Sequence, residues 1–448
     1  MTKADKKTYG GLPARLQAVR DELRRLDLDG FIVPRSDEHQ GEYVAPGSER
    51  LAWVSGFTGS AGLGIILADK AAVFIDGRYT LQAEAEVPRE LFQHCPLNDG
   101  TPTAWISENL PSGAKLGYDP WLMTPAQVRR YQAACKTAGG ALAALPPDSE
   151  NPIDAVWTDR PPASSSKVKI HPDSFAGQSA ADKRKQVSED LNDLKANAAV
   201  LTAPDSIAWL LNLRGGDVPF TPVALAFAAI HADAGADLFI DPGKITPDIE
   251  KHLGPDVRRH ALEDFGEVLD RLGKDKATVR LCPDTAPSWV QQRLEASGAD
   301  IDRGDDPCQL PKAKKTAAQL KGIRAAHRRD GASLTRFLAW LDETALDGGL
   351  TETAGADELE SLRQDNDHFQ GLSFPTISGA GPNGAIVHYR AEESTARTLA
   401  NGELYLVDSG AQYLDGTTDV TRTVAIGQPS DEMRRNFTLV LQGHIALA

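Results

Sequence analysis

One pattern of helix, apolar strand and aspartate occurs twice in the first two thirds of the chain. Residues 12–26 have the apolar spacing of an amphipathic helix, and a short apolar strand follows before Asp37. Residues 183–195 form a second, charged helix, again followed by an apolar strand before Asp205. The two copies lie about 165 residues apart, which predicts a duplicated α/β domain. The alternative is coincidence, because helix, strand, proline and aspartate follow one another in many α/β proteins.

The length of 448 residues also favours several domains, since a single domain usually has about 150 residues. A run of prolines and serines at 161–166 is typical of a linker, and a new helical pattern begins near Pro311. These features predict domains over residues 1–160, 161–310 and 311–448. The first two are expected to be α/β and the third α+β.

Composition excludes several classes of function. The formal net charge of −15 argues against nucleic acid as a partner, because phosphate binding needs a basic surface. The four cysteines are scattered, which argues against a disulfide framework or a zinc site of thiolates. The charged N-terminus lacks the apolar run of a signal peptide, and we find no apolar stretch of about 20 residues that could span a membrane. We therefore expect a cytoplasmic protein without a membrane partner.

The third segment changes from helix to strand. A helix is predicted from the N-cap Thr316 to Gly348, and a second helix is predicted near residues 358–363. Strand-like runs follow, separated by polar and glycine-rich turns that favour an antiparallel sheet. These runs cover residues 373–378, 385–389, 404–408 and 418–426.

Two aspartates stand out in the last two runs. A tight turn at Asp415 and Gly416 would place Gln412 opposite Asp419, and Asp408 would then share a face with Asp419. That register leaves the two carboxylates too far apart to share a metal, unless a bulge at Ser409 and Gly410 closes the gap. Neighbouring buried carboxylates repel unless cations neutralise them. The spacing alone leaves open both a metal site and ordinary aspartates at strand ends.

The residues around this pair resemble a known family. The run 407–423 is similar to the first metal-binding motif of the Xaa-Pro aminopeptidases, which belong with prolidase and creatinase to the "pita-bread" metallopeptidases. The run 374–389, which includes His388, resembles the substrate-binding segment of the family. Runs in both predicted α/β domains resemble the long, three-domain form; they cover residues 32–37, 54–62, 76–79 and 205–215. The resemblance implies two creatinase N-terminal-like domains followed by a partial pita-bread domain.

The chemistry implied by the resemblance is hydrolysis of the bond before a proline at the second position of a peptide. Two divalent ions, usually manganese in the family, would activate a water molecule. Asp408 and Asp419 would be metal ligands, His388 would contact the substrate or the developing oxyanion, and Arg78 would contact the substrate across a homodimer interface. The alternatives are a domain-packing role for Arg78 and a strand histidine satisfied by backbone bonds for His388. His39 is expected in packing or an interface.

The family pattern also needs one histidine and two glutamates after the aspartate pair. Beyond Asp419 the candidates are His444, within a helical pattern, and Glu432, at a helix start, and neither is expected to be a ligand. Arg422 is expected to support a nearby carboxylate. We therefore expect a fragment or truncated reading frame of a complete aminopeptidase, which lacks the remaining metal ligands, binds metal weakly and does not hydrolyse peptides alone. The alternatives are an inactive relative that binds a peptide or partner, and a C–N hydrolase of the prolidase or creatinase type.

Overall fold

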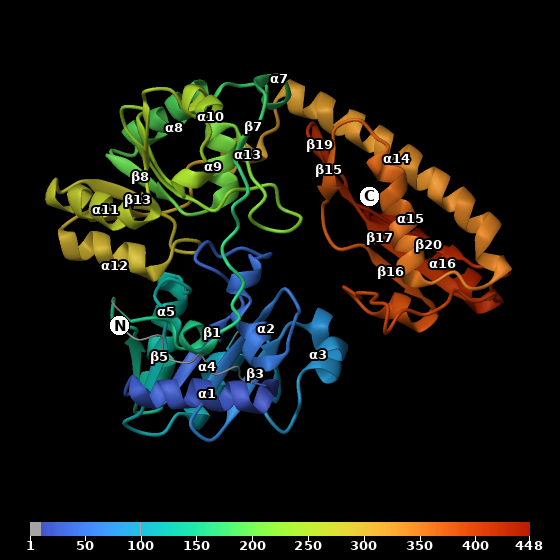
Figure 1. Ribbon diagram of the computed structural model, residues 1–448, viewed down its shortest axis with the longest axis horizontal. Coiled ribbons are helices and arrows are strands. Elements are labelled where there is room, and N and C mark those ends of the chain that lie inside the picture. Colours follow the sequence, from blue (N-terminus) through green and yellow to red (C-terminus); the bar gives the residue numbers. More distant parts are fainter. Residues whose placement is uncertain (1–9, 99, 148) are drawn as a thin grey trace. The chain divides into compact units, whose positions relative to one another are not determined.

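The computed structural model describes residues 10–98, 100–147 and 149–448 (Figure 1). It divides into two compact units, Met1–Lys315 and Thr316–Ala448, each of which is described separately. No helix within the described residues is both long and apolar enough to cross a membrane.

The first α/β domain is built on a six-stranded sheet in the order β4-β3-β2-β1-β5-β6. Its strands are β1 (Gly30–Pro34), β2 (Gly62–Leu67), β3 (Ala71–Ile75), β4 (Gln93–Pro96), β5 (Lys115–Tyr118) and β6 (Ala141–Ala144). Its helices are α1 (Gly11–Arg25), α2 (Arg50–Ser55), α3 (Thr80–Glu86), α4 (Thr101–Asn109), α5 (Pro125–Thr137) and α6 (Pro152–Val156). Strand β1 pairs antiparallel with β2 and parallel with β5, so the sheet is mixed.

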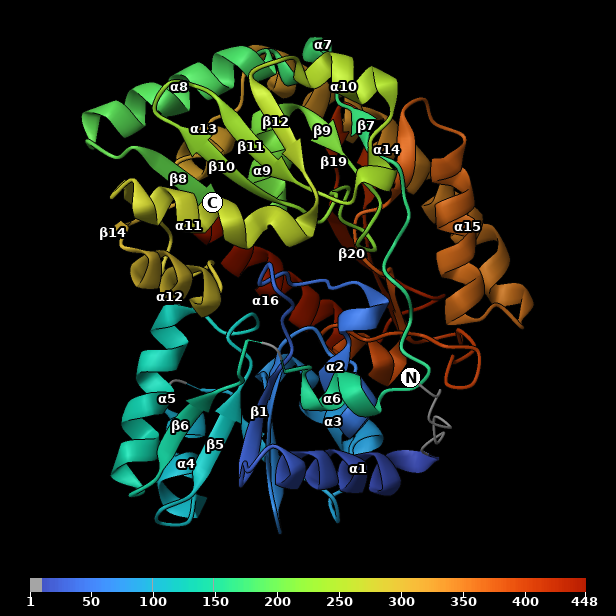
Figure 2. The ribbon, with the colours of Figure 1, turned by 60° about the vertical axis from the view of Figure 1, so that its left-hand side comes forward.

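Alternation along β1 explains why helices cover both faces of this sheet. Phe31 and Val33 are buried in the same core as Leu16 of α1, whereas Ile32 is buried on the opposite face with residues of α4 and α5 such as Trp105. Figure 2 labels these helices beside strand β1. Successive strand residues point to opposite faces, so an uninterrupted apolar strand requires two apolar layers. Burial of each large apolar side chain contributes about 1.5–3 kcal/mol.

The second α/β domain repeats this plan, with the strand order β12-β11-β10-β8-β13-β14. Its sheet strands are β8 (Ala198–Leu201), β10 (Phe227–His231), β11 (Ala236–Phe239), β12 (Val257–His260), β13 (Thr278–Leu281) and β14 (Asp300–Arg303). The larger helices are α8 (Ala180–Asp193), α9 (Pro204–Leu211), α10 (Pro247–Leu253), α11 (Phe265–Lys274) and α12 (Ser288–Ser297). From one edge to the other, the strand pairs are parallel, antiparallel, antiparallel, parallel and parallel in both sheets, which confirms the predicted duplication.

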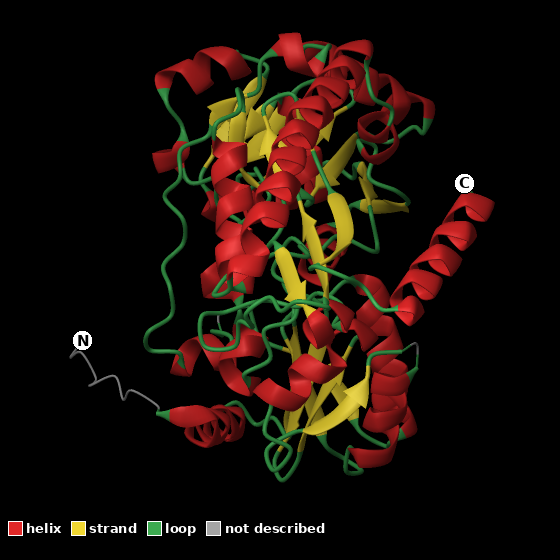
Figure 3. Ribbon diagram, turned by 90° about the vertical axis from the view of Figure 1, so that its right-hand side faces the viewer, coloured by secondary structure: helices red, strands yellow, loops and turns green. Residues whose placement is uncertain are grey.

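The C-terminal unit combines long helices with short antiparallel strands. Thr316 caps the first helix through a capping box, as predicted, and the second helix begins well before residue 358. The strands form two three-stranded sheets, β15-β18-β19 and β16-β17-β20. The elements are α14 (Ala317–Thr344), α15 (Glu352–Gln364), β15 (Phe369–Leu372), β16 (Ile377–Ala380), β17 (Leu404–Ser409), β18 (Ala411–Tyr413), β19 (Gly416–Thr417), β20 (Val420–Ala425) and α16 (Asp431–Leu447). Helix α16 ends at the terminus marked C in Figure 3 and has no buried residue.

Three predictions for this unit are wrong. Residues 373–376 lie between strands β15 and β16 and are not part of a strand over 373–378. Residues 385–389 are not a strand: a 3-10 helix over Gly381–Ala385 leads into a turn. The tight turn contains Leu414 and Asp415 instead of Asp415 and Gly416, because Tyr413 pairs with Gly416. Gly416 is used for packing, since a Cβ atom there would meet the Cα of Ile323 in α14 at 3.0 Å.

Candidate metal centre

The hairpin of β17 and β20 carries both aspartates. Asp408 pairs with Ile377 on one side and with Thr421 on the other. The paired residues on both sides of Gly410 keep one register, in which Asp419, just outside the paired segments, is diagonal to Asp408. The charge of Asp419 acts on the carboxyl group of Asp408, so the two carboxylates lie nearer each other than the predicted register implied.

Gly410 interrupts the first strand of this hairpin. The residues before it pair in the sheet of β16, β17 and β20, and those after it pair in the sheet of β15, β18 and β19. A Cβ atom at Gly410 would meet the carbonyl oxygen of Thr418 at 2.0 Å, so only glycine fits there. The strand thus changes sheets two residues after Asp408, where the sequence predicted a bulge.

Asp408 is in an environment that disfavours a lone negative charge. Burial raises the pKa of its carboxyl group, and the charge of Asp419 raises it further, while a hydrogen bond with Thr421 and the charge of His388 oppose the shift. Its Oδ1 atom is buried and has no hydrogen-bond partner among the described residues. A buried carboxylate oxygen without a donor, next to a second carboxylate, is the donor chemistry that divalent cations of the Mg²⁺, Ca²⁺ and Mn²⁺ type prefer.

The carboxylate pair fits a cation in chemistry but supplies few ligands. Within the described residues, no three histidine, cysteine, aspartate or glutamate side chains are grouped closely enough to hold a metal ion. His444 and Glu432 lie on the exposed helix α16, and Glu432 occupies its first turn, as expected. Asp408 and Asp419 remain the candidate ligands that the sequence predicted.

His388 lies in the turn after the 3-10 helix and is half-buried. Its φ of +57° places it in the left-handed region, which is unfavourable for a residue other than glycine. Its charge acts on Asp408, so the structure brings His388 near the aspartate pair. The Nη1 of Arg422 donates to the backbone oxygen of Thr421 at 2.7 Å, and the ion pairs of the described residues do not include Arg422, so its predicted support of a carboxylate is not seen.

Arg78 belongs to the N-terminal unit and follows strand β3. Asp76 accepts hydrogen bonds from the backbone nitrogen of Arg78 at 3.0 Å and from its Nε at 2.7 Å. The guanidinium lies 5.6 Å from the ring centre of Tyr79. Arg78 also lines a cavity of about 630 Å³, together with Arg35 and Arg130. The arginine is thus a partly exposed cation at a polar cavity near the end of the sheet.

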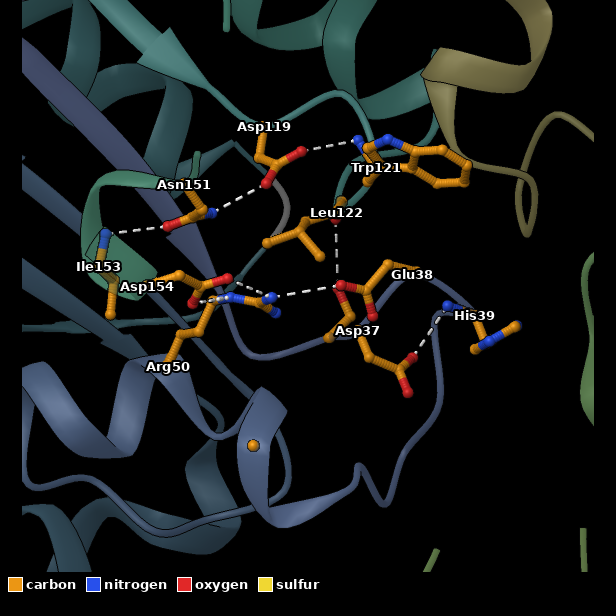
Figure 4. Close-up of polar contacts among 12 residues, drawn as sticks. Asp37, Glu38, His39, Arg50, Asp119, Trp121, Leu122, Asn151, Ile153 and Asp154 are labelled. Atoms are coloured by element: carbon orange, nitrogen blue, oxygen red, sulfur yellow. Dashed lines mark hydrogen bonds and ion pairs between the residues drawn. The ribbon is translucent and has the colours of Figure 1, made fainter. Parts of the chain in front are cut away.

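His39 joins the two α/β domains. Its Nδ1 lies 2.9 Å from the carbonyl oxygen of Thr202, and its ring stacks on Phe227 with centroids 4.5 Å apart. Figure 4 shows the polar network beside it, in which the buried Arg50 pairs with Asp154 at 2.8 Å and with Glu38 at 3.2 Å. These contacts confirm the expected interface role of His39.

Glu352 is one of the buried carboxylates that the sequence did not reveal. It lies at the start of α15, is fully buried and accepts hydrogen bonds from the segments that precede and follow His388. No local signal distinguishes it, because a glutamate in the first turn of a helix is normally an exposed residue that interacts with the helix dipole.

Comparison with known protein families matches three parts of the chain. A model described as creatinase/prolidase N-terminal domain matches residues 15–147, and a second model of the same description matches residues 159–319. The model of metallopeptidase family M24 matches residues 321–448.

Individual relatives match across the chain. A probable Xaa-Pro aminopeptidase P of Paracoccidioides lutzii is 39% identical, over 97% of this chain and 72% of the relative. The same description applies to a protein of Coccidioides posadasii, at 38% identity with the same coverage. The crystal structure of X-prolyl aminopeptidase from Caenorhabditis elegans, described as a cytosolic enzyme with a di-nuclear active site, matches with a TM-score of 0.91 and 31% identity, over 97% of this chain and 73% of that one. The chain therefore belongs to the metallopeptidase family M24, with two creatinase/prolidase N-terminal domains before the peptidase domain, and the Xaa-Pro aminopeptidases P are among its relatives.

Proposed function

We propose that this chain carries the aspartate half of a two-metal aminopeptidase site that removes the N-terminal residue from peptides with proline in second place. The observation that carries the proposal is the buried, unpartnered Oδ1 of Asp408 beside Asp419. The relatives named Xaa-Pro aminopeptidase P support the substrate class, and the di-nuclear site of the C. elegans enzyme supports two ions.

In this proposal Asp408 and Asp419 hold two divalent ions, which we take to be manganese. Such ions lower the pKa of a bound water molecule and so supply a nucleophile near neutral pH. His388 donates a hydrogen bond to the carbonyl oxygen of the scissile bond, where negative charge develops. Arg78 contacts the peptide substrate.

We also propose a cytoplasmic homodimer, in which Arg78 of one copy serves the site of the other. The description of the C. elegans relative as cytosolic supports the location. Sedimentation equilibrium tests the dimer: a mass of a single chain at micromolar concentration contradicts it. An equimolar mixture of R78A and D408N chains, which restores a wild-type site in mixed dimers, tests the exchange of Arg78 between copies by recovery of peptide binding.

Peptide recognition tests the main proposal. Isothermal titration calorimetry with Ala-Pro-Ala and Ala-Ala-Ala tests whether binding requires proline. Each titration is done with and without 1 mM Mn²⁺ (a condition chosen to be saturating), which tests whether binding requires metal. We expect the proline peptide to bind more tightly, and D408N and D419N to remove the effect of Mn²⁺ while the far-UV spectrum is unchanged. Equal binding of both peptides, or an undiminished Mn²⁺ effect in the two variants, contradicts the proposal.

A second candidate function is peptide binding without turnover. It is favoured by one observation, that the described residues hold no group of three or more histidine, cysteine, aspartate or glutamate side chains placed to bind a metal ion. A site with so few ligands binds Mn²⁺ weakly, with a Kd of about 10⁻⁴ M or higher. Release of free alanine from Ala-Pro-Ala by the purified, Mn²⁺-loaded chain rules out this second candidate and the expectation of inactivity.

A further inference from the structure

Glu352 is a fully buried carboxylate with an unusual set of partners. Its Oε1 accepts hydrogen bonds from the backbone nitrogen of Ala380 at 2.6 Å and from Asn383 Nδ2 at 3.0 Å. Its Oε2 accepts from the hydroxyl of Tyr389 at 2.8 Å and from the backbone nitrogen of Arg397 at 2.9 Å. All four donors come from one stretch of chain, residues 380–397. Burial of a carboxylate is destabilising unless the carboxylate accepts hydrogen bonds, and loss of the carboxylate would leave its buried donors without an acceptor.

The three side chains also contact one another. Asn383 Nδ2 donates to the Tyr389 hydroxyl at 2.9 Å, while that hydroxyl donates to Glu352. The contact with Glu352 contributes to raising the pKa of Tyr389 to about 12, after the larger effect of burial, so the phenol stays a donor at all working pH values. The triangle therefore fixes both ends of the turn: Asn383 lies in the 3-10 helix before it and Tyr389 at its end.

His388 lies inside this fixed turn, one residue before Tyr389. Its left-handed backbone is unfavourable for histidine and persists only where the surrounding structure imposes it. The backbone nitrogen of Tyr389 donates to the carbonyl oxygen of Ile386 at 3.2 Å, and that of Ile386 donates to Asn383 at 3.1 Å. The hydrogen bonds to Glu352 thus fix the two ends of this turn. Within the turn, the backbone hydrogen bonds leave His388 in a strained conformation near Asp408.

We propose that Glu352 is a positioning residue: its carboxylate fixes residues 380–389 so that His388 is held at the aspartate pair in the geometry that a peptide substrate meets. The proposal rests on the proposed function, in which His388 contacts the substrate. Glu352 is buried and acts through His388, so it contributes orientation and not a contact of its own.

The substitution E352Q tests the proposal with little change in shape. Glutamine keeps one acceptor oxygen but places an amide NH₂ among the donors of Asn383 and Tyr389. The matched control is E360Q on the same helix, since Glu360 accepts a single bond from Gln364 at 3.2 Å. Y389F removes one donor and leaves the carboxylate, which provides a milder second variant.

Two measurements are made on the full chain. Hydrogen exchange by mass spectrometry reports on amides of residues 380–397, where we expect exchange about tenfold faster in E352Q, an intermediate effect in Y389F and none in E360Q. Titration with Ala-Pro-Ala is done for wild type, E352Q, H388A and the double variant. We expect E352Q to raise the Kd about tenfold when His388 is present and by less than about twofold in the H388A background.

The possible outcomes distinguish a failure of the positioning role of Glu352 from a failure of the substrate contact proposed for His388. The positioning role is overturned when E352Q weakens binding equally in both backgrounds, when it leaves exchange of the turn unchanged, or when H388A weakens binding and E352Q does not. A Kd unaffected by H388A refutes the substrate contact of His388 in the proposed function, and the positioning role is then overturned with it. Coupled loss of binding together with faster exchange of the turn supports both.

Discussion

The buried ion pair between α14 and α15 allows a quantitative prediction for the unit that carries the aspartate hairpin. Arg363 donates to the two carboxylate oxygens of Asp330 at 2.8 and 3.0 Å, and both side chains are at most 3% exposed. The hydroxyl of Tyr413, in the strand that follows Asp408, also donates to Asp330 at 2.9 Å. Removal of one partner leaves a buried, uncompensated charge, which costs about 3–5 kcal/mol.

We therefore expect D330N to lower the free energy of local unfolding of residues 316–430 by about 3 kcal/mol or more. The natural control is D365N, because Asp365 pairs with Arg336 between the same two helices, at 4.0 Å and with both side chains more than half exposed. That variant is expected to cost less than about 0.5 kcal/mol. The double variant D330L/R363M, which replaces the pair by apolar groups, is expected to recover most of the loss.

Hydrogen exchange in a denaturant series measures these free energies region by region, which matters because a chain of several domains does not unfold in one step. A cost below about 1 kcal/mol for D330N, or equal costs for D330N and D365N, refutes the argument from burial. If the double variant is no more stable than D330N, then the shape of the ion pair, and not its charge balance, stabilises the packing of the two helices against Tyr413.

Three further results are expected. Burial lowers the pKa of His171 to about 4, and the unfolded histidine binds a proton near pH 6.5, so stability of the N-terminal unit should fall as pH drops from about 6.5 to 4, by up to about 3 kcal/mol. Unfolding in urea at pH 7 and 4.5 measures this loss of stability. If H171Q loses as much stability between the two pH values as the wild type, His171 is not its cause. G416A should lower the free energy of unfolding by about 1–3 kcal/mol, because the added Cβ atom pushes the hairpin away from α14. G443A should not lower it, because Gly443 lies on the exposed helix α16 and a Cβ atom there meets nothing within 4 Å. H39A should lower the unfolding midpoint of the N-terminal unit by a few degrees through loss of the bond to Thr202 and the stacking on Phe227, as read by calorimetry; an unchanged midpoint contradicts the interface role of His39.

The sequence predicted those features whose cause is local. The duplicated α/β domain was recognisable because apolar strands and amphipathic helices carry their periodicity in the residues themselves. Thr316 was recognisable as a cap because its partner, Gln319, lies three residues away. The aspartate pair was recognisable from its spacing and from the residues around it.

The errors arose where distant residues decide the structure. Asp415 and Gly416 form a strong turn dipeptide, but the close approach of Gly416 to Ile323 moves the turn back by one residue. This shift makes Asp419 a neighbour of Asp408. Likewise, nothing within residues 352–364 indicates that Glu352 is buried, because its partners begin at Ala380.

Anomalous diffraction from crystals of the protein grown with Mn²⁺ tests whether Asp408 and Asp419 hold divalent metal. We expect manganese peaks within about 2.0–2.6 Å of carboxylate oxygens of both aspartates, and no such peak in D408N/D419N. Manganese bound elsewhere in the C-terminal unit, with no density between the two aspartates, would contradict it.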